Sequence, residues 1–488
     1  MTHQLSSHSP PNLSAHPFHS LIPDTTSLIF EYFVFPPHKP IKSYSDQELQ
    51  FFSRFIRCWD FSCVLKVVGH EFYPNESPMD VKAFLKRTRG QKRTLYYVNA
   101  SNNNFLDNET FSYFRGIQKL NISGTGNSSY DSAAFRNLRG IKSLSMDYVE
   151  MIQPEAFVNL RGIESLSMAG CSQITDDALV NLIGIKHLDV RWCSQLSGRF
   201  LRSVRQAESL YIDYCYNIQD SDLENIIGIR DLSISRCHRL TKEGFKYLRN
   251  VRTLHVSDGS DLCDSALDNV RLAEDVSIGY CSIITGAGLE NLRRAKKVRV
   301  WMCDGITDHD MINFIGAHEV DISDVEVSDA TLKYFVHARV LHLSRTRHVT
   351  GEGFQFLRNL RVLHLFHCGN VRDEYFRHLS GIEHLIIQEC DHLSEAAIEP
   401  LKELKQLFIA SCNGFTKNLL MFIHGVEELF LCAMPRFHLE DEDVEKVERA
   451  FSNVKALAMH RHLVESESVV ARISGFVRQH GGRDVWMG

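Results

Sequence analysis

The sequence predicts an α/β solenoid, a stack of short parallel strands that are each followed by a short helix. The first observation is an apolar doublet, L-x-L or V-x-I, that recurs along the chain. All but the first of the steps between these doublets are 21 or 22 residues long. A unit of this length cannot bury its own apolar face, so neighbouring units must stack and share one core. The doublets begin at Leu120, Leu144, Leu166, Leu188, Leu210, Leu232, Leu254, Val276, Val298, Val320, Leu341, Leu363, Leu385, Leu407 and Leu429, with a weaker copy at Leu95 and wider-spaced copies at Leu457 and Val485.

The second observation is the order of signals within one unit, which reads LSMAGCSQITDDALVNLIGIKH from Leu166. Leu166 and Met168 are two residues apart, so both side chains point to one side of a strand. Thr175 and Asp176 offer oxygens that cap a helix, and apolar residues follow them at helical spacing. Gly184 is suited to end that helix. Each unit therefore reads as strand, turn, short helix and turn.

The third observation is a series of cysteines that follow the doublets at a constant distance of three residues. A metal site needs several ligands that converge on one point, whereas these residues occur once per unit. We therefore expect a ladder of small buried thiols without metal. Free thiols indicate a reducing compartment, so we expect a cytoplasmic or nuclear protein. The ladder consists of Cys171, Cys193, Cys215, Cys237, Cys281, Cys303, Cys368, Cys390 and Cys412.

These motifs resemble the leucine-rich repeat family and, within it, the cysteine-containing class. The pattern L-x-L-x-x-C-x-x-I-T-D occurs as LSMAGCSQITD, with the variants VRVWMCDGITD and LIIQECDHLSE. The resemblance covers residues 91 to 488 and implies a horseshoe with its strands on the concave face. The units are shorter than is usual for this class, which implies a short helix or tight turn on the convex side.

Composition excludes several classes of protein. The chain is 44% hydrophobic and 23% charged with a net charge of −6, as expected for a globular protein. It has no apolar run of about 18 residues and no basic stripe, so we expect neither a membrane nor a nucleic acid as partner. Residues 1 to 20 are rich in Ser, His and Pro and read as a disordered tail. The basic stretch from Lys82 to Arg93 reads as a solvated cap helix.

Residues 21 to 90 lie outside the repeats and are expected to be helical. Leu28, Ile29 and Phe33 share one helical face, and a second apolar pattern at helical spacing leads to Trp59. The region resembles an F-box, with a Leu-Pro start, an Ile-Phe helix and a helix with Cys and Trp. The corresponding residues here are Leu21 and Pro23, Ile29 and Phe30, and Cys58 and Trp59.

The F-box resemblance implies that the N-terminal helices bind the adaptor of a cullin-type ubiquitin ligase while the repeats hold a protein substrate. The match departs from the family in spacing, because Ile22 separates Leu from Pro and Cys58 adjoins Trp59. A plain cap over the open first repeat would show a similar apolar pattern. Both interpretations therefore stay open. The residues that the resemblance assigns to the adaptor are Leu21, Pro23, Leu28, Ile29 and Phe33.

The outward positions of the strands change along the predicted concave face. They are small in the first repeats, as at Ser167, and large from about residue 190 to 410. Trp, Tyr and Arg are enriched at protein-binding hot spots, although a solvated sheet also carries aromatic residues for cross-strand packing. We expect the partner to bind at Arg191, Trp192, Tyr211, Asp213, Tyr214, Arg236, His255, Tyr280, Arg299, Trp301, Met302, His342, Arg345, His364, Phe366, His367, Glu389 and Phe408.

Catalytic signatures are absent from the sequence. We find no Gly-rich phosphate loop, no G-x-S-x-G and no H-E-x-x-H, so we expect no enzymatic activity, no metal and no cofactor. His342 and His364 share one phase in neighbouring repeats, but no short ligand spacing supports a metal there. The sequence therefore favours a protein-binding substrate receptor of a ubiquitin ligase. The alternative is a leucine-rich repeat scaffold or sensor without a ligase link.

Overall fold

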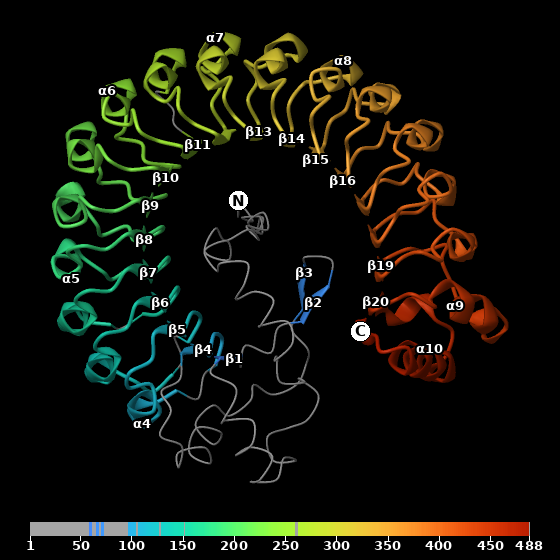
Figure 1. The fold of residues 1–488 in the computed structure, drawn as a ribbon, viewed down its shortest axis with the longest axis horizontal. Helices are drawn as coiled ribbons and strands as arrows, with labels where there is room; N and C mark the ends of the chain where they lie inside the picture. The colour runs from blue at the N-terminus through green and yellow to red at the C-terminus, as the bar shows by residue number, and fades with distance from the viewer. Residues whose placement is uncertain are drawn as a thin grey trace, which may run out of the picture.

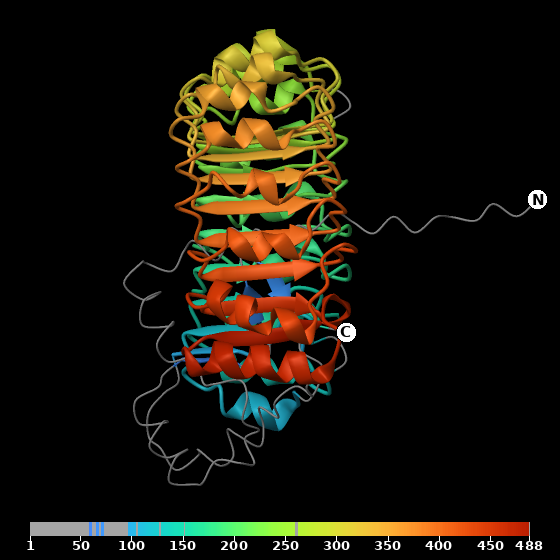
Figure 2. The ribbon, with the colours of Figure 1, turned by 90° about the vertical axis from the view of Figure 1, so that its right-hand side faces the viewer.

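The computed structural model describes residues 58–60, 65–67, 70–72, 96–103, 106–125, 128–150, 152–258 and 262–487. In these residues one 19-stranded sheet lines the inside of an open ring, and short helices cover its outside (Figures 1 and 2). Each strand pairs in parallel with the next along the chain, and Leu232 lies opposite Leu254 as predicted. The leucine-rich repeat solenoid expected from the doublets is confirmed.

The strands are three residues long in the first repeats and five residues long from β11 onward. Their bounds are β1 (Cys58–Asp60), β4 (Tyr97–Asn99), β5 (Lys119–Asn121), β6 (Ser143–Ser145), β7 (Ser165–Ser167), β8 (His187–Asp189), β9 (Ser209–Tyr211), β10 (Asp231–Ser233), β11 (Thr253–Ser257), β12 (Asp275–Gly279), β13 (Lys297–Trp301), β14 (Glu319–Ser323), β15 (Val340–Ser344), β16 (Val362–Phe366), β17 (His384–Gln388), β18 (Gln406–Ala410), β19 (Glu428–Cys432), β20 (Ala456–His460) and β21 (Arg483–Met487). A separate antiparallel hairpin consists of β2 (Leu65–Val67) and β3 (His70–Phe72).

The helices of the regular repeats have seven residues or fewer, as the short period requires. The α-helices are α4 (Asn108–Ser112), α5 (Asp176–Leu179), α6 (Lys242–Phe245), α7 (Gly286–Leu289), α8 (Asp329–Leu332), α9 (Val444–Ala450) and α10 (Glu467–Gln479). The 3₁₀ helices are η3 (Ser132–Leu138), η4 (Pro154–Leu160), η5 (Gly198–Arg202), η6 (Asp220–Ile226), η7 (Asp264–Asn269), η8 (Glu290–Leu292), η9 (Asp308–Phe314), η10 (Glu352–Phe356), η11 (Asp373–His378), η12 (Glu395–Ala397), η13 (Lys417–Met421), η14 (Asp441–Asp443) and η15 (Arg461–Leu463).

One continuous hydrophobic core runs between the strands and the helices. The doublet residues supply its inner side, and the helical segments supply its outer side, several of them with a buried phenylalanine. Phe354 and Phe376 are both buried and meet edge to face with ring centroids 5.8 Å apart. Because every repeat shares its core with two neighbours, no repeat can fold without them.

Polar side chains tie the helix starts of successive repeats together. Asp176 accepts a hydrogen bond from the Ser197 hydroxyl at 2.6 Å, and Asp220 accepts one from the Thr241 hydroxyl at 2.7 Å. Asp176 thus reaches the next repeat instead of capping its own helix, and Thr175 precedes that helix without a side-chain capping bond. The helix end predicted at Gly184 is wrong, because α5 ends at Leu179 with Val180 as its C-cap, and Gly184 with its φ of 85° lies in the turn that follows.

The nine ladder cysteines are buried with free thiols, as predicted. Several thiols donate to a carbonyl of the preceding repeat, as Cys171 does to Met146 at 3.2 Å and Cys193 to Met168 at 3.3 Å. Burial raises the pKa of Cys171 to about 12, so its thiol stays protonated. The ladder is therefore a hydrogen-bonded part of the core.

The N-terminal region departs from the helical expectation wherever the structure describes it. Between residues 21 and 90 these parts are β1, β2 and β3, which are all strands. The helix predicted to reach Trp59 is wrong at that residue, because β1 pairs with the otherwise open edge of β4. The residues assigned to the adaptor, which are Leu21, Pro23, Leu28, Ile29 and Phe33, lie outside the described residues. Among the described residues, no helix is long and apolar enough to cross a bilayer.

Candidate functional site

The concave face is built from rows of residues that the strand register aligns across repeats. The third residue of each strand points away from the core and forms its central row. From β8 to β19 this row reads Asp189, Tyr211, Ser233, His255, Ser277, Arg299, Asp321, His342, His364, Ile386, Phe408 and Phe430. The row is polar in its first half and apolar at its end.

A buried polar network occupies the first half of the concave face. Arg191 forms a two-pronged ion pair with Asp189, in which its Nη2 lies 2.7 Å and its Nε 3.0 Å from the carboxylate oxygens. Asp213 accepts the Ser233 hydroxyl at 2.7 Å and the Ser235 backbone N–H at 2.6 Å. The Arg191–Asp189 pair lies within one repeat, whereas the bonds to Asp213 join successive repeats of the sheet.

Two residues predicted to be exposed partner contacts are buried in this network. Tyr211 is 8% exposed beneath the Arg191 guanidinium, which lies 5.8 Å from its ring, and Asp213 is 7% exposed. Burial raises the pKa of Asp213 to about 6. The prediction of an exposed side chain is therefore wrong for both residues, although both lie on the predicted face.

Trp301 is the last residue of β13. Its side chain is half-buried and packs over the neighbouring strand β12. A Cβ added to Gly279 of β12 would lie 1.9 Å from Cε2 of the Trp301 ring. The indole therefore occupies the space that glycine leaves at the paired position, Gly279 opposite Trp301. Part of its area serves cross-strand packing, as the alternative interpretation of the concave aromatics expected.

One edge of the concave face is a row of residues in the left-handed backbone conformation. We call this row the rim. It follows the strand ends and consists of Asn102, Gly124, Tyr148, Gly170, Trp192, Tyr214, Arg236, Asp258, Tyr280, Met302, Asp324, Arg345, His367, Glu389, Ser411 and Ala433, each with φ between 48° and 73°. Each non-glycine residue there carries strain of about 1 kcal/mol or more.

The strain at the rim has a local cause in the sheet hydrogen bonds. The N–H of Trp192 donates to the Asp213 carbonyl at 2.9 Å, and that of Tyr280 donates to the Trp301 carbonyl at 3.0 Å. The left-handed turn thus keeps the ladder intact while it redirects the chain toward the buried cysteine. Glycine would meet this backbone requirement with less strain, so the large side chains are not needed for the turn itself.

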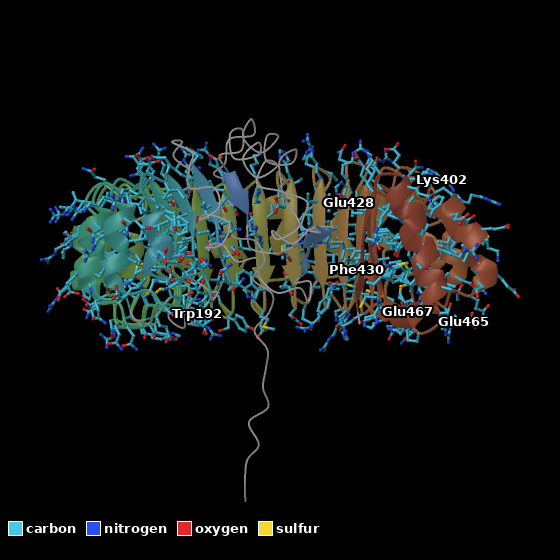
Figure 3. All side chains as sticks on the ribbon, turned by 90° about the horizontal axis from the view of Figure 1, so that it is seen from below. Trp192, Lys402, Glu428, Phe430, Glu465 and Glu467 are labelled. Atoms are coloured by element: carbon cyan, nitrogen blue, oxygen red, sulfur yellow. The ribbon has the colours of Figure 1, made fainter. Side chains whose placement is uncertain are left out.

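Several rim side chains are large and exposed. Tyr148 is 62%, Trp192 37% and Tyr280 46% exposed, and Figure 3 shows Trp192 at one edge of the solenoid. Trp192 stacks on Tyr214 with ring centroids 3.7 Å apart, and the Arg236 guanidinium lies 5.1 Å from the Tyr214 ring. These predicted partner residues from three successive repeats therefore form one continuous platform.

Further along the rim, charged side chains pair across repeats. Arg345 contacts Asp324 at 3.1 Å and His367 contacts Glu389 at 3.2 Å. A shallow hollow of about 330 Å³ lies beside the second pair and is lined by His367, Glu389, Asp391, Ser411, Asn413 and Ala433. Met302 and Phe366 stand half-buried along the same stretch. Most of the predicted partner residues therefore share one continuous surface.

The concave histidines do not form a metal centre among the described residues. His342 and His364 stack with ring centroids 3.9 Å apart, and no cluster of three metal-binding side chains occurs in the described ranges. His255 lies half-buried between Arg191 and Arg299 on the same face. Burial, helped by the positive charges of Arg299 and Arg191, lowers the pKa of His255 to about 4.

Phe408 was predicted to be an exposed partner contact, and this prediction is wrong. The side chain is 3% exposed and stacks on Phe430, with ring centroids 3.8 Å apart. Figure 3 shows Phe430 on the sheet, away from the edge where Trp192 lies. Both rings belong to a small hydrophobic cluster that is separate from the main core.

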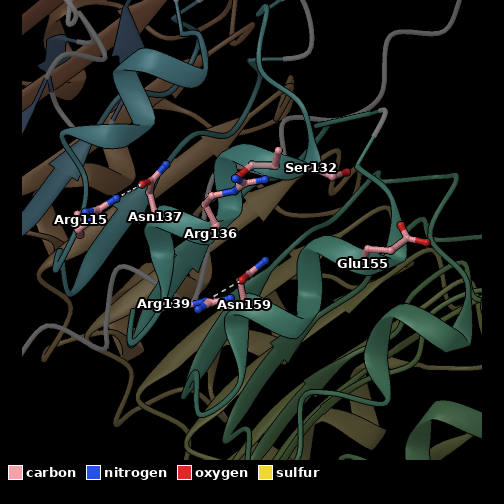
Figure 4. Close-up of a pocket in the computed structure, with 8 residues that line it drawn as sticks. Arg115, Ser132, Arg136, Asn137, Arg139, Glu155 and Asn159 are labelled. Carbon is pink, nitrogen blue, oxygen red and sulfur yellow. Dashed lines mark hydrogen bonds between the residues drawn. The ribbon is translucent and has the colours of Figure 1, made fainter.

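A larger hollow lies on the helix side of the first repeats (Figure 4). It measures about 680 Å³ and is lined by Arg115, Ser132, Ala133, Arg136, Asn137, Arg139, Glu155 and Asn159. Arg115 donates to Asn137 at 3.2 Å and Arg139 to Asn159 at 3.0 Å. The same Arg-to-Asn link recurs between Arg161 and Asn181 at 3.1 Å and between Arg293 and Asn313 at 2.9 Å, so it is a regular connection between repeats.

No protein-family description matches the chain, and no curated protein matches its sequence. Similar solved structures include the TLR13–ssRNA13 complex, with TM-score 0.47, 14% identity and coverage of 84% of this chain and 66% of that one. The mouse RP105/MD-1 complex has TM-score 0.48 and 12% identity, and the match covers 81% of this chain and 70% of that one. The yeast Rad7–Elc1 complex has TM-score 0.42 and 13% identity, and the match covers 62% of this chain and 78% of that one. At these values the similarity supports no inference about function.

Proposed function

We propose that this chain is a non-catalytic receptor that holds a protein partner along the rim and the open part of the concave face. The observation that carries the proposal is the exposed rim platform of Trp192, Tyr214 and Arg236, continued by Tyr280. Each of these residues retains a strained backbone in a place where glycine would fit. Trp, Tyr and Arg are also the residue types that dominate binding energy at protein interfaces.

In this proposal the receptor acts by positioning, which raises the effective concentration of its partner. The N-terminal region links it to the adaptor of a cullin-type ubiquitin ligase through Leu21, Pro23, Leu28, Ile29 and Phe33. The F-box resemblance of the sequence supports this link. The free thiol ladder supports a cytoplasmic or nuclear location.

The second candidate is a scaffold or sensor without a ligase link. The pairing of β1 with β4 favours it, because this strand caps the open edge of the sheet as a simple N-terminal cap would. Trp59, which the F-box resemblance uses, belongs to that strand. The two candidates share the rim and differ only at the N-terminus.

Binding of the purified adaptor to the full-length chain separates the two candidates. The receptor proposal expects the wild type to capture the adaptor and the double variant Ile29→Asp, Phe33→Asp to lose it. Trp192→Ala is the matched control, since it alters the rim and should keep the adaptor. If the wild type captures no adaptor, the ligase link is wrong and the scaffold remains.

A further inference from the structure

Burial varies along the central row of the concave face, where Tyr211 (8% exposed), Ser233 (6%) and Ser277 (4%) are buried before the row opens at β13. The side chains of Arg299, Asp321 and His342 are each about one-third exposed, at 32%, 32% and 31%. From β17 onward the row continues with apolar residues that are buried. We call these residues the end patch, which consists of Ile386 (8% exposed), Phe408 (3%), Phe430 (5%) and Ala458 (0%).

Stacking within the row does not explain this burial. The rings of His342 and His364 stack 3.9 Å apart at 12°, and those of Phe408 and Phe430 stack 3.8 Å apart at 3°. Stacking covers the faces of a ring and leaves its outer edge open, and His342 accordingly stays 31% exposed. The two stacks have matching geometry but different exposure, and this difference points to a further cover over the end patch.

The hairpin of β2 and β3 lies at the end patch. β2 contacts β19 and β20, and Figure 1 places the hairpin inside the ring beside those strands. The hairpin register pairs Leu65 with Phe72 and Lys66 with Glu71, so apolar and charged pairs alternate along the ladder. An isolated two-stranded hairpin is at best marginally stable in water, so this one needs a supporting surface.

The hairpin is also tied to the opposite end of the array. β1 ends at Asp60, which pairs with Asn99 of β4 in the first repeats. Five residue steps separate Asp60 from Leu65, and an extended chain spans at most about 3.6 Å per step, or roughly 18 Å. The segment from β1 to β3 therefore joins the first strand of the solenoid to its last strands.

We propose that the end patch is the docking surface for residues 65–72 of the same chain, and that this docked hairpin is a clasp that closes the horseshoe. The clasp limits how far β4 and β19 can move apart, because β1 is paired at one end and β2 is docked at the other. A partner on the rim between β8 and β13 binds without moving the clasp, whereas a ligand on β17–β20 must displace it. This inference goes beyond the receptor function and stands without it.

Hydrogen exchange of the full-length chain tests the docking. In the wild type, the amides of residues 65–72 should exchange at least tenfold more slowly than in the double variant Phe408→Ser, Phe430→Ser. Phe366→Ser is the matched control, because Phe366 faces the same side on β16 outside the end patch. The repeats should retain their circular dichroism and their exchange protection in both variants. Equal exchange of residues 65–72 in the wild type and the double variant overturns the proposal.

A photo-crosslinking amino acid in place of Phe430 identifies the occupant directly. The proposal expects crosslinks within one chain to residues 65–72, and these should persist on dilution. Crosslinks to a second copy of the chain, which would fade on dilution, overturn it. Absence of any crosslink to residues 65–72 overturns it as well, since a docked hairpin cannot avoid a reactive group at the centre of the patch.

Discussion

Two aromatic stacks on this solenoid have nearly the same geometry and different surroundings. Trp192 and Tyr214 stack 3.7 Å apart at the rim, and Phe408 and Phe430 stack 3.8 Å apart on the central row. The rim pair carries an indole N–H and a phenol hydroxyl that water can satisfy, and Trp192 is 37% exposed. The phenylalanine pair has no polar atoms and is buried. The Trp192–Tyr214 pair suits a surface that binds and releases a partner. The Phe408–Phe430 pair requires a cover that stays in place.

The largest expected effect is a difference in unfolding free energy between variants of the two stacks. Phe408→Ala should destabilise the chain by about 3 kcal/mol, because it removes a buried aromatic ring from a packed cluster. Trp192→Ala should cost about 1 kcal/mol, since it loses a stacking contact at an exposed edge. Denaturant unfolding followed by circular dichroism measures both. Equal losses would show that the end patch is no better covered than the rim.

The next effect concerns Trp301, which lies between the two stacks on the sheet. Gly279→Ala should cost about 1–3 kcal/mol, because the new Cβ would overlap the Trp301 ring that now lies there. Gly228→Ala is the control, as a Cβ at that glycine meets no atom within 4 Å. Thermal melting and the tryptophan emission spectrum report the change. If both variants melt alike, Trp301 does not rest on the sheet.

The buried polar network at the start of the concave face predicts a pH dependence. The pKa of His255 is about 4 in the folded chain and about 6.5 in the unfolded one, so acidification through this window favours unfolding. The pKa of Asp213 is raised to about 6, so between pH 6 and 4 its protonation favours folding. The variant His255→Gln removes the acid destabilisation that comes from His255 and leaves the contribution of Asp213 in place. The melting temperature of this variant relative to wild type should therefore be higher at pH 4.5 than at pH 7, and a constant difference would contradict the burial of His255.

The smallest effect on stability is expected at the rim. Tyr280→Gly removes an exposed side chain at φ 52° and relieves strain of about 1 kcal/mol, so the melting temperature should stay the same or rise. Binding of a rim partner should weaken in the same variant. Tyr280→Phe keeps the ring and the strain, and it serves as the control. A fall in melting temperature for the glycine variant would show that Tyr280 supports the fold.

The sequence predicts the strand phase well, because period-2 alternation and the 22-residue repeat depend only on local chemistry. It places Trp192, Tyr214 and Arg236 at outward positions. It does not predict their left-handed backbone, although glycine at the equivalent positions 124 and 170 is a signal that this turn needs positive φ. The strain of the rim thus becomes visible only in the structure.

The errors in prediction come from contacts that the local pattern does not contain. Alternation assigns Tyr211, Asp213 and Phe408 to the concave face, but it does not reveal what covers them. Helical spacing around Trp59 predicts a helix, whereas the unpaired edge of β4 draws Cys58–Asp60 into a strand. In both cases an interaction distant in sequence overrides the local preference.

Hydroxyl-radical footprinting of the full-length chain tests the contrast between the open rim and the covered end patch most directly. The account predicts rapid modification of Trp192 and Tyr280, and modification of Phe408 and Phe430 at a rate at least about tenfold lower once intrinsic reactivities are taken into account. Addition of a partner should protect Trp192 and Tyr280 and leave Phe408 unchanged. If Phe408 and Phe430 react as fast as the rim aromatics, the concave face is open along its whole length and the division into a binding rim and a clasped end is wrong.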